Sequence, residues 1–301
     1  MRSSLTKGLL LTQEAFMRTT FGARLQDIKK GKLADEDAVS FKNFWLGTGG
    51  EYRNYLHAHF PFGNHKQLYK DLVSTDAAAI NFFLFIKQNK SDASILKWLG
   101  NILCFGSALR AIESIEFGYP SAKYGTDIES VTFHIYLKIL TAENLKIGIG
   151  FSFSLAENYL SKALARNRRI GNKSCLYNII KQAANLNYPL NFQAHSKYRE
   201  HVPFIYRHSL AATLASGKKL DQFRYIHMFP PGNELQYDAA IAFKEIIIPP
   251  LQETLNVLDF ETFIGLGLVC LKDNNNGCDW LSYLERRYGK NGYPTKLNNQ
   301  F

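Results

Sequence analysis

The apolar pattern of the chain changes at residues 117–129, and this change constrains the fold class more than any other feature. Before it, apolar residues recur at the three- and four-residue spacing of amphipathic helices. After it, residues 130–140 and 145–154 alternate in polarity and are rich in β-branched and aromatic side chains, which is typical of strands. Asn144 lies where a turn between the two strands is expected. The sequence therefore predicts an α+β protein with a few strands near residues 130–154.

Helices are predicted on both sides of these strands. In the N-terminal part the helical spacing covers residues 9–28, 38–46, 77–86 and a long run from 91 to 118. After the strands, Ser154 and Glu157 have the spacing of a capping box, and Gly171 follows the expected helix. Further helices are expected before Pro189, over residues 205–217 and 237–248, and in the C-terminal tail. For residues 237–248 a buried strand is the alternative.

The segment 117–129 is also the best candidate for a domain boundary, because it is rich in Gly, Pro and Ser. We divide the chain into a helical region, residues 1–117, and a basic α+β region, residues 125–301. A chain of 301 residues is long enough for two modest domains or one large one, so a single domain remains an alternative.

Basic side chains are concentrated in one part of the chain. The formal net charge is +10, and residues 160–227 contain twelve basic and two acidic residues, so this segment accounts for the whole excess. Its acids are Glu200 and Asp221, and residues 164–199 contain none. The basic residues are Lys162, Arg166, Arg168, Arg169, Lys173, Lys181, Lys197, Arg199, Arg207, Lys218, Lys219 and Arg224.

This distribution favours a polyanionic partner. A solvated surface normally mixes charges of both signs, and like charges that lie close together repel one another. Phosphates relieve that repulsion, and counterions are released when they bind. Aromatic residues lie between the bases, as stacking on unpaired bases requires. We therefore predict a nucleic-acid-binding protein that contacts phosphates of RNA or single-stranded DNA non-specifically through these twelve residues, alone or within a nucleoprotein complex.

Two alternatives remain open. The first is a metal-dependent nuclease or another enzyme that acts on nucleic acid, with Asp127 and Glu129, or His57, His59 and His65, as metal ligands. Neither set has a decisive motif, so we assign no catalytic residue, metal site or cofactor. The second is an interaction subunit whose basic face binds an acidic protein. The sequence also leaves open whether the chain forms a homo-oligomer.

The remaining features concern location. The four cysteines form no C-x-x-C pair, which favours reduced thiols inside a cell. No apolar run reaches the ~18 residues of a membrane-spanning helix. The first 25 residues contain one acid, as organelle transit peptides do, but an ordinary amphipathic helix is preferred. We expect an intracellular, cytoplasmic protein without a membrane partner.

Overall fold

The computed structural model describes residues 4–22, 28–29, 31–47, 49–103, 108–119, 133–155, 198–217 and 219–289. The chain divides into two compact units. Unit 1 comprises Met1–Ala111, Phe229–Gly232 and Asp259–Phe301, and unit 2 comprises Ile112–Met228 and Asn233–Leu258. Helices and a five-stranded sheet together confirm the predicted α+β class.

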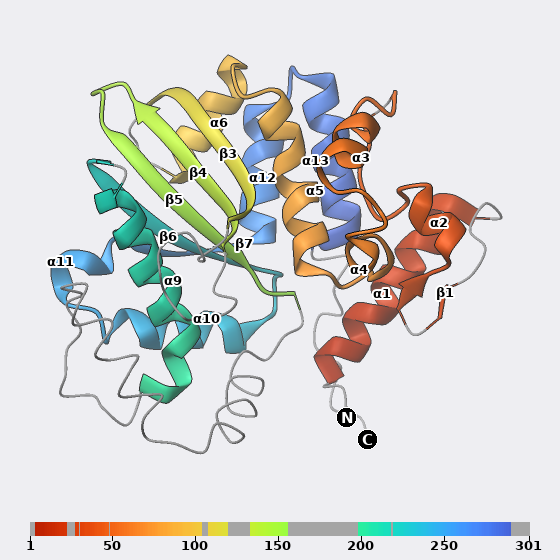
Figure 1. The fold of residues 1–301 in the computed structure, drawn as a ribbon, viewed down its shortest axis with the longest axis horizontal. Helices are drawn as coiled ribbons and strands as arrows, with labels where there is room; N and C mark the ends of the chain where they lie inside the picture. Colours follow the sequence, from red (N-terminus) through yellow and green to blue (C-terminus); the bar gives the residue numbers. More distant parts are fainter. Residues whose placement is uncertain are drawn as a thin grey trace. The chain divides into compact units, whose positions relative to one another are not determined.

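Unit 1 is mainly helical, and its central helix is α5 (Thr75–Gln88) (Figure 1). Residues 77–86 of α5 are all buried, because this apolar run faces neighbouring elements on every side. The Ser74 side chain accepts a hydrogen bond from the Ala77 amide and caps the helix. The other elements are α1 (Ser4–Phe21), β1 (Ile28–Lys29), β2 (Lys32–Leu33), α2 (Asp35–Val39), α3 (Arg53–His59), α4 (Lys66–Lys70), α6 (Ala93–Leu103), α12 (Phe260–Cys270) and α13 (Asn275–Tyr288).

A fully buried arginine lies in the core of unit 1. The guanidinium of Arg287, on α13, donates hydrogen bonds to Gln13 Oε1 at 2.9 Å, to the Asn43 carbonyl at 2.7 Å and to Tyr283 Oη at 2.6 Å. It also donates to Asn43 Oδ1. The rings of Phe16, Tyr283 and Tyr288 lie within about 6 Å of it. These contacts join α1, α13 and the turn at Asn43, and we call them the Arg287 shell.

Unit 2 contains the sheet, whose strand order is β3-β4-β5-β6-β7 (Figure 1). Strands β4 and β5 are antiparallel, whereas β5 and β6 are parallel and are connected through α9. The helix packs on the sheet through Phe204, Leu210 and Leu214, which are buried. The elements are β3 (Leu109–Tyr119), β4 (Phe133–Thr141), β5 (Lys146–Phe153), α9 (Tyr198–Gly217), β6 (Gln222–Phe229), α10 (Glu234–Lys244), α11 (Pro249–Gln252) and β7 (Leu255–Asp259).

Helix α9 runs antiparallel to β6. Near its start the ring of Phe204 lies 5.0 Å from that of His227, and one turn later His208 lies 5.2 Å from Phe223. After the helix ends, the Asp221 amide donates to the Lys146 carbonyl at the beginning of β5. The start of α9 therefore lies at the end of the sheet where β5 and β6 finish, which we call the carboxyl edge.

The two predicted strands and their turn are confirmed as β4, β5 and a left-handed Asn144. The helix at 205–217 is confirmed as part of α9, and the preferred helix at 237–248 is confirmed as far as Lys244, where α10 ends. The prediction of a helix through residue 118 was wrong, because the chain forms β3 from Leu109. Leu109, Ile112 and Ile115 are buried three residues apart, so a strand buried on both faces has the apolar spacing of a helix.

Gly148 and Gly150 of β5 make room for aromatic rings of β4. A Cβ at Gly148 would lie 2.4 Å from Tyr136 Oη, and one at Gly150 would lie 2.3 Å from Phe133 Cε1. The two glycines are therefore explained by packing across the strand pair. Among the described helices, none is both long and apolar enough to cross a membrane.

Candidate nucleic-acid interface

Most of the predicted phosphate-contacting residues lie outside the described residues. These are Lys162, Arg166, Arg168, Arg169, Lys173, Lys181, Lys197 and Lys218. Asp127 and Glu129, the acidic pair of the nuclease alternative, also lie outside them, as does the helix expected after Ser154. Arg199 is in the first turn of α9, but its side chain is not described.

The structure places the other three basic residues at different points of unit 2. Arg207 is a partly buried residue of α9, one turn after Phe204. Lys219 is exposed in the turn before β6, and Arg224 is partly buried near the start of β6. The Arg224 guanidinium donates to the Glu253 carbonyl at 2.8 Å. Only Arg207 is therefore near the carboxyl edge, and the structure does not bring it together with Lys219 and Arg224.

Polar side chains of three strands lie close to the carboxyl edge. Ser152 of β5 pairs with His227 of β6, and Ser152 Oγ lies 2.8 Å from His227 Nδ1. Paired residues on adjacent strands present their side chains on the same face, so Ser152 and His227 form one row. On the other side Ile135 of β4 pairs with Phe151, and His134 precedes this pair. His134 contacts the end of β5 through its hydrogen bond with the Phe153 amide.

Tyr225 and Gln236 extend this row. Tyr225 Oη lies 2.6 Å from Ser152 Oγ, and His227 Nε2 lies 3.0 Å from Gln236 Oε1 at the start of α10. Ser152, His227 and Gln236 are all buried, and so is the Tyr225 ring. Together with Arg207, we call His134, Ser152, Tyr225, His227 and Gln236 the edge cluster. Buried polar groups that lie this close together are informative, because they cost free energy unless they are hydrogen-bonded.

Both histidines of the edge cluster are neutral. Burial, followed by the positive charge of Arg207, lowers the pKa of His227 to about 3, although the Gln236 hydrogen bond acts in the opposite direction. For His134 the same two causes, with His227 as a third, also give a pKa of about 3.

The hydrogen bonds assign the protons of this row. Gln236 Oε1 can only accept, so His227 Nε2 carries the hydrogen and Nδ1 accepts from the Ser152 hydroxyl. Ser152 has one hydroxyl hydrogen, so Tyr225 O–H must donate to Ser152 Oγ. The His134 Nδ1 atom accepts from the Phe153 amide at 3.0 Å. Each contact thus has one donor and one acceptor without any charged imidazole.

The edge cluster lies where the basic segment leaves and rejoins the described chain. Leu155 directly follows β5 at the carboxyl edge, and Tyr198 begins α9 at the same edge. Residues 156–197 connect these two points and contain seven basic residues and one acid, Glu157. The ends of parallel strands are where α/β sheets commonly bind ligands. Leu155 and Tyr198, the described residues on either side of the basic segment, therefore lie at an edge of this kind.

Other residues that sequence reasoning singled out belong to the core. Phe204 and Tyr225, which lie among the bases in the sequence, are buried in unit 2 and cannot stack on a nucleic-acid base. His208, also in this segment, is buried; its Nε2 lies 2.6 Å from Thr254 Oγ1, and burial lowers its pKa to about 3. His208 and His227 therefore add no positive charge at neutral pH. Their burial has no clear sequence signal, because both lie in a strongly polar segment.

The histidines of the alternative metal site are exposed in unit 1. His57 and His59 lie in α3, and His65 precedes α4. The His59 ring stacks on Tyr55 at 3.9 Å, and its Nδ1 lies 2.9 Å from the Tyr55 carbonyl. Within the described parts of the chain, no three His, Cys, Asp or Glu side chains lie close enough to hold a metal ion.

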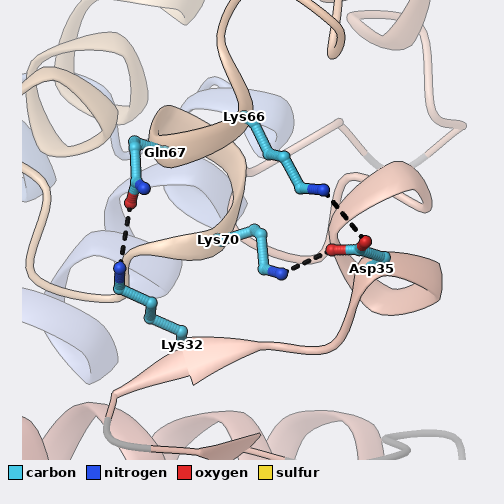
Figure 2. A network of polar contacts seen from close by, with 5 residues as sticks. All are labelled: Lys32, Asp35, Lys66, Gln67 and Lys70. Atoms are coloured by element: carbon cyan, nitrogen blue, oxygen red, sulfur yellow. Dashed lines mark hydrogen bonds and ion pairs between the residues drawn. The ribbon is translucent and has the colours of Figure 1, made fainter.

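Several basic residues of unit 1 lie close to acidic ones. Asp35 accepts from Lys66 at 3.1 Å and from Lys70, while Lys32 Nζ donates to Gln67 Oε1 at 3.2 Å (Figure 2). The hydrogen bonds from Lys70 and Lys66 lower the pKa of Asp35. Lys42 pairs in the same way with the buried Asp37. Lys42, Lys66 and Lys70 therefore have local counter-charges, whereas the partner of Lys32 is an uncharged amide.

No protein-family model, curated protein or solved structure matches this chain.

Proposed function

We propose that the protein binds single-stranded nucleic acid, RNA or DNA, through its phosphates, and that residues 156–197 with the start of α9 are the main contact region. One observation carries the proposal. This segment contains seven bases and one acid, and the described residues on either side of it, Leu155 and Tyr198, lie at the carboxyl edge of the sheet.

Electrostatics supports this partner. Seven positive charges within 42 residues, offset by one acid, give a high local charge density. A bound nucleic-acid strand lowers the repulsion between these positive charges, and the counterions that it releases make binding more favourable in entropy. Contacts of this kind do not depend on base sequence, because they go to phosphates. A single strand is favoured over a duplex because its backbone can follow an irregular surface.

A charge-reversal experiment tests the proposal. Arg166→Glu with Arg169→Glu is expected to weaken binding of a labelled 20-nucleotide strand about 10- to 100-fold for every base sequence. The slope of log affinity against log salt concentration should fall by at least about 1. Fluorescence anisotropy over a salt series measures both quantities. The matched control, Lys272→Glu with Arg286→Glu, makes the same change in net charge at exposed positions of unit 1. If both double variants lose the same affinity, the weakening depends only on the overall charge of the protein and not on Arg166 and Arg169.

The two alternatives give different results in parallel assays. An enzyme that acts on nucleic acid would cleave the labelled strand when divalent ions are added, whereas a binding protein leaves it intact. A subunit that binds an acidic protein would be purified without nucleic acid, with a low ratio of absorbance at 260 nm to that at 280 nm. If the unaltered protein fails to bind any strand at low salt, the proposed function is wrong.

A further inference from the structure

Helix α12 of unit 1 has an exposed face that is apolar. Its buried side consists of Phe260, Phe263, Ile264 and Gly267. On the opposite side Leu266 and Val269 are 43% and 71% exposed, and Val269 is the most exposed large apolar side chain among the described residues. Thr262 and Gly265 lie between them on this side and are exposed too. An exposed apolar face of this kind is typical of a surface that contacts another protein.

Helix α13, which packs against α12, has the usual arrangement of a surface helix. Its exposed residues are all polar: Asn275, Asn276, Asp279, Glu285 and Arg286. In contrast, the chain contains no charged residue between Glu261, in the first turn of α12, and Lys272. The apolar exposed face is therefore a property of α12 and not of the helices of unit 1 in general.

The two glycines in the second half of α12 have different surroundings. A Cβ at Gly267 would lie 2.9 Å from Leu281 Cδ1 and 3.0 Å from Trp98 Cζ2, so packing inside unit 1 explains this glycine. A Cβ at Gly265 would have no atom within 4 Å. Glycine destabilises the interior of a helix relative to alanine, and its advantage is that another backbone can approach closely. A second helix on the exposed face would explain Gly265.

The charges at the two ends of α12 are complementary to each other. Glu261 and Lys272 are both exposed, and the ion pairs among the described residues include neither. They are about three helical turns apart, so they lie on the same side of the helix. When two copies of α12 pack antiparallel, Glu261 of each copy lies beside Lys272 of the other. In the same register Val269 of one copy lies over Gly265 of the other, and the two Leu266 side chains meet.

We propose that a second copy of this chain packs antiparallel on the exposed face of α12, about a two-fold axis near Leu266. Such an interface is self-complementary, as two-fold symmetry requires. Because α12 has 11 residues and is therefore about 17 Å long, it buries less area than a standard interface does. We therefore expect a reversible dimer with a Kd on the order of 10 μM. The inference does not depend on the proposed function.

The first experiment measures the mass of the protein by sedimentation velocity at concentrations from about 1 to 200 μM, on both sides of the expected Kd. The unaltered chain should change from monomer to dimer across this series. Val269→Asp places a charge in the centre of the interface and should raise Kd at least about 10-fold. The matched control is Leu11→Asp, because Leu11 on α1 is 68% exposed. It should change Kd less than about 2-fold.

The second experiment tests the antiparallel pairing. Glu261→Lys places two lysines together at both ends of the interface and should raise Kd about 5-fold. Adding Lys272→Glu to this variant restores both ion pairs and should return Kd to within about 2-fold of the parent. Gly265→Leu should raise the Tm of the monomer, because leucine favours a helix, yet it should raise Kd at least about 10-fold, because Val269 of the other copy loses its space.

Three results would overturn the proposal. The first is an unaltered chain that remains monomeric through the whole concentration series. The second is equal weakening of the dimer by Leu11→Asp and Val269→Asp, which would place the interface outside α12. The third is a charge-exchanged double variant that dimerises no better than Glu261→Lys alone, since the antiparallel pairing would then be wrong.

Discussion

The two units bury polar groups in different ways. Unit 1 encloses a guanidinium, that of Arg287, whose hydrogen bonds go to the uncharged acceptors of Gln13, Asn43 and Tyr283. Unit 2 encloses imidazoles, those of His208 and His227, which stay neutral because burial lowers their pKa. An arginine is charged at every physiological pH, whereas a histidine gains its charge in mild acid. The Arg287 shell therefore depends on hydrogen-bond geometry, and the edge cluster depends on pH as well.

The largest expected effect comes from removing the cation of unit 1. Arg287→Met removes the hydrogen bonds that Gln13 Oε1, Asn43 Oδ1 and Tyr283 accept inside a buried core, while the Asn43 carbonyl keeps its hydrogen bond from Asn81 Nδ2. We expect a loss of about 3 to 5 kcal/mol in the free energy of unfolding of unit 1, because each unsatisfied buried polar group costs about 1 to 3 kcal/mol. Denaturant unfolding measures the loss. Amide hydrogen exchange shows whether it is confined to α5 and α13.

The adjacent residue Arg286 provides the control for Arg287→Met. Arg286 is exposed on α13 and donates to the Ser282 carbonyl at 3.3 Å. Arg286→Met removes the same charge and should change stability by less than about 0.5 kcal/mol. A similar loss in both variants would mean that burial of Arg287 contributes nothing specific to unit 1.

The second-largest expected effect is the loss of stability of unit 2 in mild acid. In the unfolded chain each imidazole titrates near 6.5, and in unit 2 His134, His208 and His227 have pKa values of about 3. Between these values the unfolded state binds more protons, so stability decreases as pH falls from 6.5 towards 3. At pH 5.5 the loss is about 1.4 kcal/mol for each histidine, or about 4 kcal/mol for the three together.

Hydrogen exchange at pH 7 and 5.5 measures this effect separately in each unit. After correction for the intrinsic pH dependence of exchange, amides of β5 and β6 should lose protection, whereas those around Arg287 should not. His208→Phe should remove about a third of the acid sensitivity, because one of the three imidazoles with a lowered pKa is gone. Equal acid responses in the two units would contradict the comparison.

Local patterns in the sequence were enough for the fold class and for several elements. Alternating residues identified β4 and β5, and Gly217 marked the end of α9. The spacing of apolar residues predicted a helix wrongly at β3, because a strand buried on both faces can have apolar residues three positions apart, as a helix does. The assignment of α12 and α13 to unit 1 with α5 has no local signature either, because it depends on contacts between segments about 200 residues apart.

The candidate site was predictable only in its charge. Composition identified the basic segment, but it could not show that Ser152 and His227 face each other, since their pairing follows from the crossover through α9. Composition also grouped Arg207 with Lys219 and Arg224, which lie elsewhere in unit 2. His208 and His227 had the appearance of additional bases, because sequence does not reveal the burial that keeps them neutral.

The smallest expected effect compares two serines of unit 2. Ser152 Oγ joins Tyr225 to His227, whereas Ser114 Oγ is buried without a hydrogen-bond partner among the described residues. Ser152→Ala should cost about 1 to 2 kcal/mol, because it leaves both neighbours without their partner, and Ser114→Ala should be neutral or slightly stabilising. Denaturant unfolding at pH 7 measures the difference. If the two variants lose the same stability, the hydrogen bonds of Ser152 do not stabilise unit 2 more than any other buried hydroxyl does. The edge cluster would then differ from the Arg287 shell only in its response to pH.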